Sequence, residues 1–228
     1  SQTVYYYWAF LQLDNVDKVN FIVPSGNFGN IYAGHVANKM GLPIEKLYLV
    51  TNANDILHRI ISRGEMVIKE VQRTYSPSMD IQISSNFERQ LFEILNHDNV
   101  KLTSVMNSFV QEGSYNLDND AINKLQNIYS THSVSDPEIL QTIELYSKKY
   151  KYTADPHTAT GLKILEEIED FKNDSISIAC AHPSKFSQAI KKATGNEVEY
   201  PDSLSKIFDK NEKFTILNNN INDIKEFI

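Results

Sequence analysis

The chain has 228 residues, and 41% of them are apolar, a proportion typical of a globular core. Its 22 Lys and Arg against 29 Asp and Glu give a net charge of −7 without any basic block, which argues against nucleic acid as a partner. No apolar stretch approaches the roughly 20 residues that a membrane-spanning helix needs, so no membrane partner is expected. The single cysteine, Cys180, cannot form a disulfide within the chain and favours a reducing, cytoplasmic setting.

The first residues have the character of a buried helix. The sequence starts with Ser1 and not with Met, and residues 4–13 are almost all apolar or aromatic. A helix that is apolar on all sides is typical of a protein interior. We therefore expect a core helix here and further sequence upstream of Ser1.

Residues 21–64 alternate between short apolar runs and helical spacing, which predicts strands and helices in turn. In chain order we expect a strand at 21–23, a turn at 25–30, a helix at 31–40, a strand at 47–50, and a helix that starts at Asn54 or Asp55 and ends near Gly64. Pro24 ends the first strand, while Gly41 and Pro43 end the first helix. This repeated pattern of strand and helix indicates a parallel α/β sheet.

Residues 76–150 show more helical patterns and fewer strand signals than the residues before them. The clearest helices are expected at 87–95 and 137–149. We interpret this region as a helix-rich insertion or subdomain. Residues 1–75 then form the first part of an α/β domain, with the turn at 25–30.

The α/β pattern returns in residues 151–228, which are predicted to complete the site begun by the first part. Asp155 followed by Pro156 is typical of a helix start, and this helix is expected to run to Phe171. The further elements expected are a strand at 175–181, a turn at 182–184, and a helix at 185–194 that Gly195 ends.

The turn at residues 25–30, with the sequence Ser-Gly-Asn-Phe-Gly-Asn, is the clearest sign of ligand binding. Glycines allow the backbone to approach a ligand closely, and free N–H groups at a helix start attract an anion such as phosphate. The turn lacks the third glycine of the dinucleotide-binding pattern, and no Lys-Ser/Thr pair follows it as in a Walker loop. The pattern alone leaves a phosphate site and a plain strand-to-helix turn equally open.

Five segments resemble those of threonine synthases and occur in the order of that family. They are PSGNFGNIYAGHVANKMGLP (24–43), TNANDIL (51–57), SPSMDIQISSNFER (76–89), DPHTATG (155–161) and AHPSKF (181–186). Residues 1–10 also resemble the helix that precedes the loop in the family. The resemblance therefore extends over most of the chain.

This resemblance implies a parallel-sheet α/β fold of the tryptophan-synthase-β type, which is fold type II of the enzymes that use pyridoxal 5'-phosphate (PLP), with a mostly helical insertion in the middle. It also implies a lyase of threonine biosynthesis that converts O-phospho-L-homoserine and water to L-threonine and phosphate. Gly26, Asn27, Phe28 and Asn30 match the family's cofactor-phosphate loop, and Gly29 is expected to allow the turn.

Thr158 matches the family residue whose hydroxyl faces the pyridine nitrogen of PLP. A neutral donor does not stabilise a protonated pyridinium as an aspartate does, so the ring nitrogen is expected to stay largely unprotonated. Taken alone, Thr158 also fits a threonine that caps its own helix. Thr160 stands where the family is expected to have a small apolar residue, a departure that we assign to packing.

Arg89 is a candidate for substrate binding, because a guanidinium group can hold a phosphate or a carboxylate through two hydrogen bonds. The same segment also fits an ordinary helix start, with Ser85 or Asn86 as the N-cap and Arg89 in solvent. Asp55 is interpreted as a helix cap. The six histidines show no metal-ligand spacing, so no metal site is predicted.

The lysine that binds PLP as a Schiff base lies, in this family, in a Phe-Lys-Asp type segment well upstream of the phosphate loop. Nothing before Pro24 resembles that segment, and Lys18 lies in a polar linker. Lys185 is interpreted as a surface lysine in the first turn of a helix. We therefore expect a C-terminal portion whose catalytic lysine lies upstream, and we assign no catalytic residue within the chain.

Two alternatives stay open. The first is a noncatalytic protein that binds a phosphate-bearing ligand and lacks the lysine. The second is another PLP enzyme of fold type II, such as a serine/threonine dehydratase. The segments SPSMDI and SSNFER favour threonine synthase over the dehydratase.

Overall fold

The computed structural model describes residues 1–168, 174–202 and 210–228. The chain divides into two compact units, residues 1–198 and residues 199–228. The second unit contains helix α11 (Ile221–Phe227), whose first turn is capped by the Asn220 side chain. The first unit holds the sheet and the helices around it, and it positions the candidate site.

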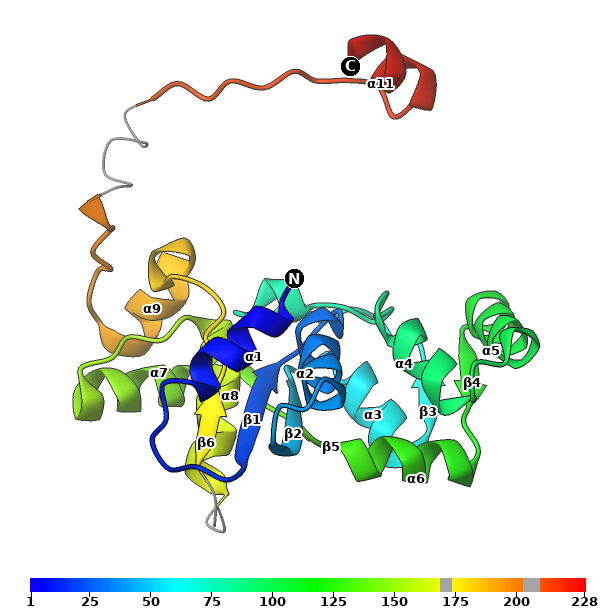
Figure 1. The fold of residues 1–228 in the computed structure, drawn as a ribbon. Coiled ribbons are helices and arrows are strands. Elements are labelled where there is room, and N and C mark those ends of the chain that lie inside the picture. The colour runs from blue at the N-terminus through cyan, green and yellow to red at the C-terminus, as the bar shows by residue number, and fades with distance from the viewer. Residues whose placement is uncertain (169–173, 203–209) are drawn as a thin grey trace. The chain divides into compact units, whose positions relative to one another are not determined.

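A parallel sheet forms the centre of the first unit (Figure 1). It has four strands in the order β5-β2-β1-β6. Their bounds are Val19–Pro24 for β1, Ile44–Thr51 for β2, Tyr129–Ser133 for β5 and Ser175–Ser177 for β6. Because the strands are parallel, their carboxyl ends meet at one edge. The chain leaves β1 toward β2 on one side and returns as β6 on the other, and such a switch point is where α/β sheets bind ligands.

Strand β1 is buried along its whole length, as expected for a central parallel strand covered on both faces. Alternate residues of β1 belong to different core clusters: Phe21 and Val23 to one, and Ile22 to the other. The apolar run from Val19 to Pro24 therefore fills the core on both sides of the sheet.

Two sets of helices contribute to these two clusters. The first cluster contains residues of α1 (Thr3–Phe10), α2 (Gly29–Lys39), α3 (Ile56–Arg63), α4 (Phe87–Ile94), α5 (Asn99–Glu112) and α6 (Asn119–Ile128). The second contains residues of α7 (Asp136–Tyr150), α8 (Pro156–Glu167) and α9 (Ser187–Thr194). The result is a sheet between two helical layers. An antiparallel hairpin of β3 (Glu65–Val67) and β4 (Ser114–Asn116) and the short 3-10 helices η1 (Pro77–Met79) and η2 (Pro183–Phe186) complete the described elements.

The predicted parallel α/β fold is confirmed, as are most of its elements. Gly64 and Gly195 end α3 and α9 in the left-handed conformation, as predicted. Strand β6 is shorter than predicted and ends at Ser177. Helix α8 ends at Glu167, and the predicted continuation to Phe171 falls partly on residues 169–173, which lie outside the described residues.

Strand β5 was not predicted, because its sequence Tyr-Ser-Thr-His-Ser is mostly polar. It pairs with β2 at the edge of the sheet, where only Tyr129 is fully buried among its residues. The division into residues 1–75, 76–150 and 151–228 stays a prediction.

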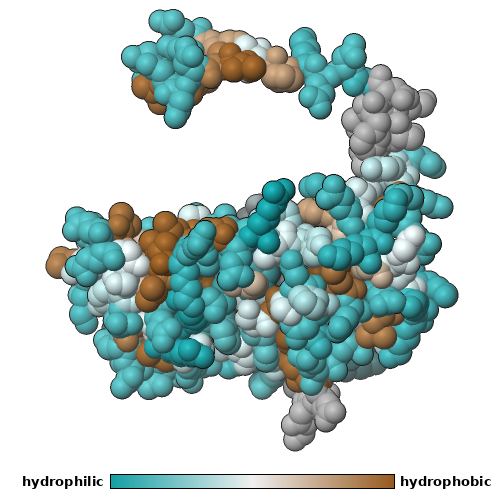
Figure 2. All heavy atoms as spheres, turned by 180° about the vertical axis from the view of Figure 1, so that it is seen from behind, coloured by the Kyte–Doolittle hydropathy of each residue, from teal (hydrophilic) through white to brown (hydrophobic). Residues whose placement is uncertain are grey.

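The expectation of a fully buried first helix is wrong. Within α1 only Tyr6 is buried, and large apolar side chains on its other sides are exposed, namely Val4, Tyr5 and Trp8. The helix packs on α2 along one side only. On the opposite face of the molecule, drawn in Figure 2, apolar residues come to the surface in separate groups between polar ones. None of the described helices has the length and apolarity needed to cross a bilayer.

The contact between α1 and α2 requires a glycine at position 34. A Cβ atom on Gly34 would lie 2.6 Å from Cε1 of Tyr6 and 3.0 Å from Cδ2 of Leu47. We expect Gly34→Ala to lower the free energy of unfolding by about 1–3 kcal/mol, because the Tyr6 ring must move. Gly29→Ala in the same helix is the matched control, since its Cβ would meet nothing closer than 3.4 Å. Urea unfolding measures both, and equal stabilities would contradict this account.

Candidate functional site

The loop after β1 turns sharply at Phe28, which has a φ of 63° and is the N-cap residue of α2. A left-handed backbone costs a residue with a side chain about 1–2 kcal/mol. The Phe28 ring is fully buried, and its centroid lies 5.2 Å from that of Phe87 and 5.4 Å from that of Tyr129, both edge-on. Core packing therefore holds the turn. The expectation that Gly29 allows the turn is wrong, because the left-handed residue is Phe28.

Position 26 requires a glycine because its backbone lies very close to the segment around η1. A Cβ atom there would lie 2.9 Å from Cα of Met79 and 3.0 Å from the carbonyl oxygen of Ser78. Backbone atoms cannot yield as a flexible side chain can. The loop and η1 thus form one packed unit.

Hydrogen bonds fix the rest of the loop. The Asn27 carbonyl oxygen accepts from Nδ2 of Asn86 at 2.9 Å, and Asn27 Oδ1 accepts from the hydroxyl of Ser85 at 3.3 Å. The Asn30 carbonyl oxygen accepts from the buried hydroxyl of Tyr6 at 2.8 Å. The segment SSNFER, which the sequence suggested for substrate binding, therefore also braces the loop.

The loop offers donors without protein acceptors. None of the backbone N–H groups of residues 26–30 donates a hydrogen bond to another described residue. Ser25 Oγ is buried beside them without a partner among the described residues. These groups face a cavity of about 580 Å³ at the start of α2. Of these residues Ser25 and Phe28 are buried, Gly26, Gly29 and Asn30 are half-buried, and Asn27 is exposed. Buried donors normally have partners, so the Ser25 hydroxyl and the helix start beside it fit a bound phosphate group.

The cavity lies where the carboxyl ends of β1 and β6 meet. All five predicted loop residues line it: Gly26, Asn27, Phe28, Gly29 and Asn30. The chain after β6, residues 178–181, forms the facing wall, together with His157. Thr158 and Arg89 are not among the lining residues. Arg89 lies on the exposed side of α4, so the structure does not bring it to the cavity.

Thr158 is buried behind the cavity wall and is held by Asp155. Its hydroxyl donates to Asp155 Oδ2 and accepts from the Cys180 backbone N–H at 2.9 Å. The Asp155 carboxylate also accepts from the backbone N–H groups of His157 and Ala181, at 3.0 and 3.2 Å. The predicted N-cap at Asp155 is confirmed, and the same carboxylate joins α8 to the chain after β6.

In this geometry the Thr158 hydroxyl already has an acceptor within the chain, the Asp155 carboxylate. Burial by itself raises the pKa of the Asp155 carboxyl, but hydrogen bonds from His157 and Thr158 outweigh it and lower that pKa below its usual value. An ionised carboxylate only accepts, so it takes the hydroxyl proton of Thr158. One lone pair of the hydroxyl remains, and it can only accept.

His157 connects the same carboxylate to η1. Its Nδ1 lies 2.9 Å from Asp155 Oδ1, and its Nε2 accepts the Ser78 backbone N–H at 3.1 Å. Nδ1 must therefore carry the proton, and a charged imidazolium would lose the bond to Ser78. The protein atoms around the thiol and the nearby Asp155 raise the pKa of Cys180 above its usual value, although the residue is exposed at the cavity wall.

A second polar network explains two of the matched segments. Asp80 Oδ1 accepts from Nδ2 of Asn52 at 2.8 Å, from Nδ2 of Asn54 at 3.0 Å and from the Thr74 hydroxyl at 2.6 Å. Asn52 and Asn54 follow β2 in the segment TNANDIL, and Asp80 belongs to SPSMDI. These residues fasten the chain before η1 to the sheet edge.

Asp55 differs from its predicted role. It occupies the N-cap position of α3, but its side chain caps no N–H group there. Instead its Oδ1 accepts from Nε of the buried Arg59 at 2.8 Å. The sequence signal was ambiguous, because an Asp four residues before an Arg on a helix fits both roles.

The buried Asp155 predicts a dependence of stability on pH. The folded pKa lies below the value of 3.8 expected for an unfolded chain, so the stabilisation is complete above pH of about 4 and is lost as the pH falls through the folded pKa. We expect Asp155→Asn to lower the free energy of unfolding at pH 7 by about 2 kcal/mol or more. The loss should shrink in acid, as urea unfolding across this pH range measures. Asp98→Asn, at the exposed cap of α5, is the control, and a loss independent of pH would contradict the assignment.

Comparison with known proteins places this site in a family. A family model described as "Threonine synthase, C-terminal" matches residues 158–228. Threonine synthase of Pseudomonas aeruginosa is 34% identical over 231 residues, covering 100% of this chain and 49% of the relative. Threonine synthase of Saccharomyces cerevisiae is 38% identical over 235 residues, covering 91% of this chain and 46% of the relative. The chain thus spans about half the length of these relatives.

Solved structures agree with the sequence matches. A PLP-bound threonine synthase from Brucella melitensis superposes with a TM-score of 0.92 and 40% identity, covering 99% of this chain and 49% of that one. A fungal L-serine ammonia-lyase from Rhizomucor miehei shares the fold alone, with a TM-score of 0.52 and 12% identity over 85% of this chain and 56% of that one. The fold is therefore that of type II PLP enzymes, and the chain belongs to the threonine synthase family.

Proposed function

We propose that the protein is a PLP-dependent threonine synthase, which converts O-phospho-L-homoserine and water to L-threonine and phosphate in the cytoplasm. The observation that carries the proposal is the loop of residues 26–30, whose N–H groups face the cavity without protein acceptors. The likeness to threonine synthases along the whole chain supports it.

Bound PLP supplies an electron sink for carbanion chemistry. In our proposal the backbone N–H groups of Gly26, Asn27, Phe28, Gly29 and Asn30 bind its phosphate, and the orphaned Ser25 hydroxyl adds a donor. The strained turn at Phe28 holds these N–H groups in their binding orientation before the ligand binds, so the loop needs little reorganisation on binding.

We further propose that Thr158, under the control of Asp155, meets the ring nitrogen as an acceptor. Since its proton is committed to Asp155, its remaining lone pair favours a nitrogen that carries a proton. This reverses the protonation expected from the sequence. That Arg89 binds the substrate also stays a proposal. It is supported by the position of Arg89 three residues after Asn86, whose side chain contacts the loop.

The source of the Schiff-base lysine is also a proposal. Lys18 pairs with Glu45 at 2.7 Å and does not line the cavity, whereas Lys185 does. We keep the expectation that the lysine belongs to sequence that precedes this chain. Borohydride reduction of the PLP complex followed by peptide mapping identifies it, and a phosphopyridoxyl group on Lys185 would replace this proposal.

The test of the function is an assay of the natural full-length protein with O-phospho-L-homoserine. Threonine and inorganic phosphate should appear in equal amounts and only with PLP. Gly26→Val should lower PLP affinity at least tenfold, because the added side chain displaces the loop from η1. Gly113→Val, in a surface position with no atom within 4 Å of its Cβ, controls for general strain. PLP binding without any turnover would favour the noncatalytic alternative, and turnover of serine or threonine to a keto acid would favour the dehydratase.

The protonation proposal has its own readout. With PLP labelled with ¹⁵N in the ring, the ¹⁵N chemical shift should report a protonated nitrogen at neutral pH in the natural protein. Asp155→Asn and Thr158→Val should shift it toward the unprotonated value, because the acceptor is lost. Thr158→Ser, which keeps the hydroxyl, should behave like the natural protein. An unprotonated nitrogen in the natural protein would reject the role of Asp155 without affecting the assignment as a threonine synthase.

A further inference from the structure

The hydroxyl of Tyr6 contacts the last residue of the loop. Helix α1 packs on α2 (Figure 1), and Tyr6 is the buried residue of α1. Its hydroxyl oxygen lies 2.8 Å from the carbonyl oxygen of Asn30 and 3.2 Å from Oδ1 of the same residue. Asn30 lines the loop cavity, whereas Tyr6 does not. A hydroxyl outside the cavity thus contacts both the main chain and the side chain of a residue that lines it.

The packing around the Tyr6 ring fixes the position of this hydroxyl. The ring is fully buried, and its centroid lies 4.8 Å from that of Phe21, edge-on. It also contacts α2 at Gly34, where a Cβ atom would lie 2.6 Å from Cε1 and 2.8 Å from Cζ of the ring. A ring packed in this way stays in one rotamer, so the hydroxyl is in place before any ligand binds.

The Tyr6 hydroxyl is a donor to Asn30. Burial raises the pKa of Tyr6 far above its usual value, so the hydroxyl keeps its proton at neutral pH. The carbonyl oxygen and Oδ1 of Asn30 carry no hydrogen and can only accept, and one O–H group can be shared between two such acceptors. The oxygen side of the Asn30 amide therefore faces Tyr6.

This orientation leaves the nitrogen side of the Asn30 amide free. In a planar amide that accepts through Oδ1, the two hydrogens of Nδ2 lie on the other branch. No described residue accepts a hydrogen bond from Nδ2 of Asn30. Because Asn30 lines the cavity, Nδ2 is available to an anion there, beside the backbone N–H groups of residues 26–30.

We propose that Tyr6 is a positioning residue for the loop. Its hydroxyl holds the Asn30 amide with Nδ2 toward the cavity, so that this group donates to the phosphate of the ligand. An unrestrained asparagine side chain loses rotamer freedom on binding, and prior fixation removes that cost. The inference rests on the proposed function for the identity of the ligand, PLP, but the fixed amide is a property of the protein without ligand.

The first experiment measures the mobility of the Asn30 amide without ligand. In the natural full-length protein, labelled with ¹⁵N at asparagine, the relaxation of Asn30 Nδ2 should report a rigid group. Tyr6→Phe keeps the ring and removes only the hydroxyl, so the same amide should become mobile on the nanosecond timescale or faster. Equal mobility in the natural protein and in Tyr6→Phe overturns the proposal.

Tyr7→Phe is the matched control for this measurement. Tyr7 follows Tyr6 in α1, and its hydroxyl donates to the Met40 carbonyl oxygen at the other end of α2, at 3.4 Å. Its removal should leave the Asn30 amide rigid. An amide that becomes as mobile in Tyr7→Phe as in Tyr6→Phe would show a general loosening of the contact between the helices and would contradict the role of the Tyr6 hydroxyl.

The second experiment measures PLP affinity in a double-mutant cycle. Tyr6→Phe should weaken binding roughly three- to tenfold, the contribution of one hydrogen bond, and Tyr7→Phe should not. In an Asn30→Ala background Tyr6→Phe should cause little further loss, because no amide is left to hold. A merely structural role of Tyr6 gives the same fold loss in both backgrounds, and that result overturns the proposal. If the natural protein binds no PLP, the proposed function fails, while the relaxation measurement still decides whether Tyr6 holds Asn30.

Discussion

The candidate site depends on the burial of one aromatic ring, that of Phe28. This residue has a left-handed backbone, which is conformationally unfavourable, at the point where the chain passes from β1 to α2. Burial of a phenylalanine side chain contributes about 1.5–3 kcal/mol, which offsets the strain. The ring packs against Phe87 of α4 and Tyr129 of β5, so distant parts of the chain determine how the loop presents its N–H groups.

Asp155 has a comparable role on the facing wall. Its carboxylate binds the start of α8, the chain after β6 and, through His157, the backbone of Ser78. Three segments that share no sequence neighbourhood thus meet at one ionised group. Such a group does not itself contact a ligand. It orients the residues that do, as the hydrogen-bond partners of metal-binding side chains do in metal sites.

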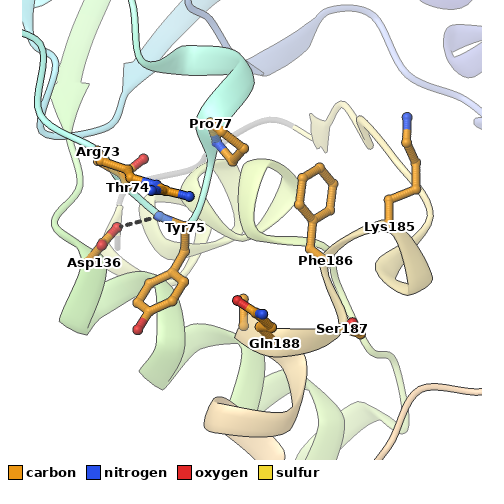
Figure 3. Close-up of a pocket in the computed structure, with 10 residues that line it drawn as sticks. Arg73, Thr74, Tyr75, Pro77, Asp136, Lys185, Phe186, Ser187 and Gln188 are labelled. Atoms are coloured by element: carbon orange, nitrogen blue, oxygen red, sulfur yellow. Dashed lines mark hydrogen bonds between the residues drawn. The ribbon is translucent and has the colours of Figure 1, made fainter.

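A cavity lined by residues 73–75, Pro77, Asp136 and residues 185–189 adjoins this arrangement (Figure 3). It shares Phe186 with the loop cavity, and the Phe186 ring lies 4.7 Å from that of His157. The two cavities are physically adjoining.

The sequence by itself determined the parallel α/β fold, the positions of α2, α3 and α8, and the loop of residues 26–30. These features depend on local rules: apolar periodicity, glycine at helix ends, and an Asp-Pro helix start. The family resemblance added the cofactor. The edge strand β5 escaped prediction because a half-exposed strand of polar residues has little apolar alternation.

Only the tertiary structure decided which residues form the turn and the polar contacts of the site. Phe28, and not Gly29, takes the left-handed turn, because its ring finds a buried place that no local rule could foresee. The Thr158 hydroxyl donates to Asp155, three residues earlier, because that carboxylate is buried and ionised beside it. Arg73 and Lys185, which are far apart in the sequence, line one cavity because η1 and α9 pack at the same edge of the sheet. Burial and pairing between distant segments set the strength and direction of each polar contact, and a sequence pattern carries neither.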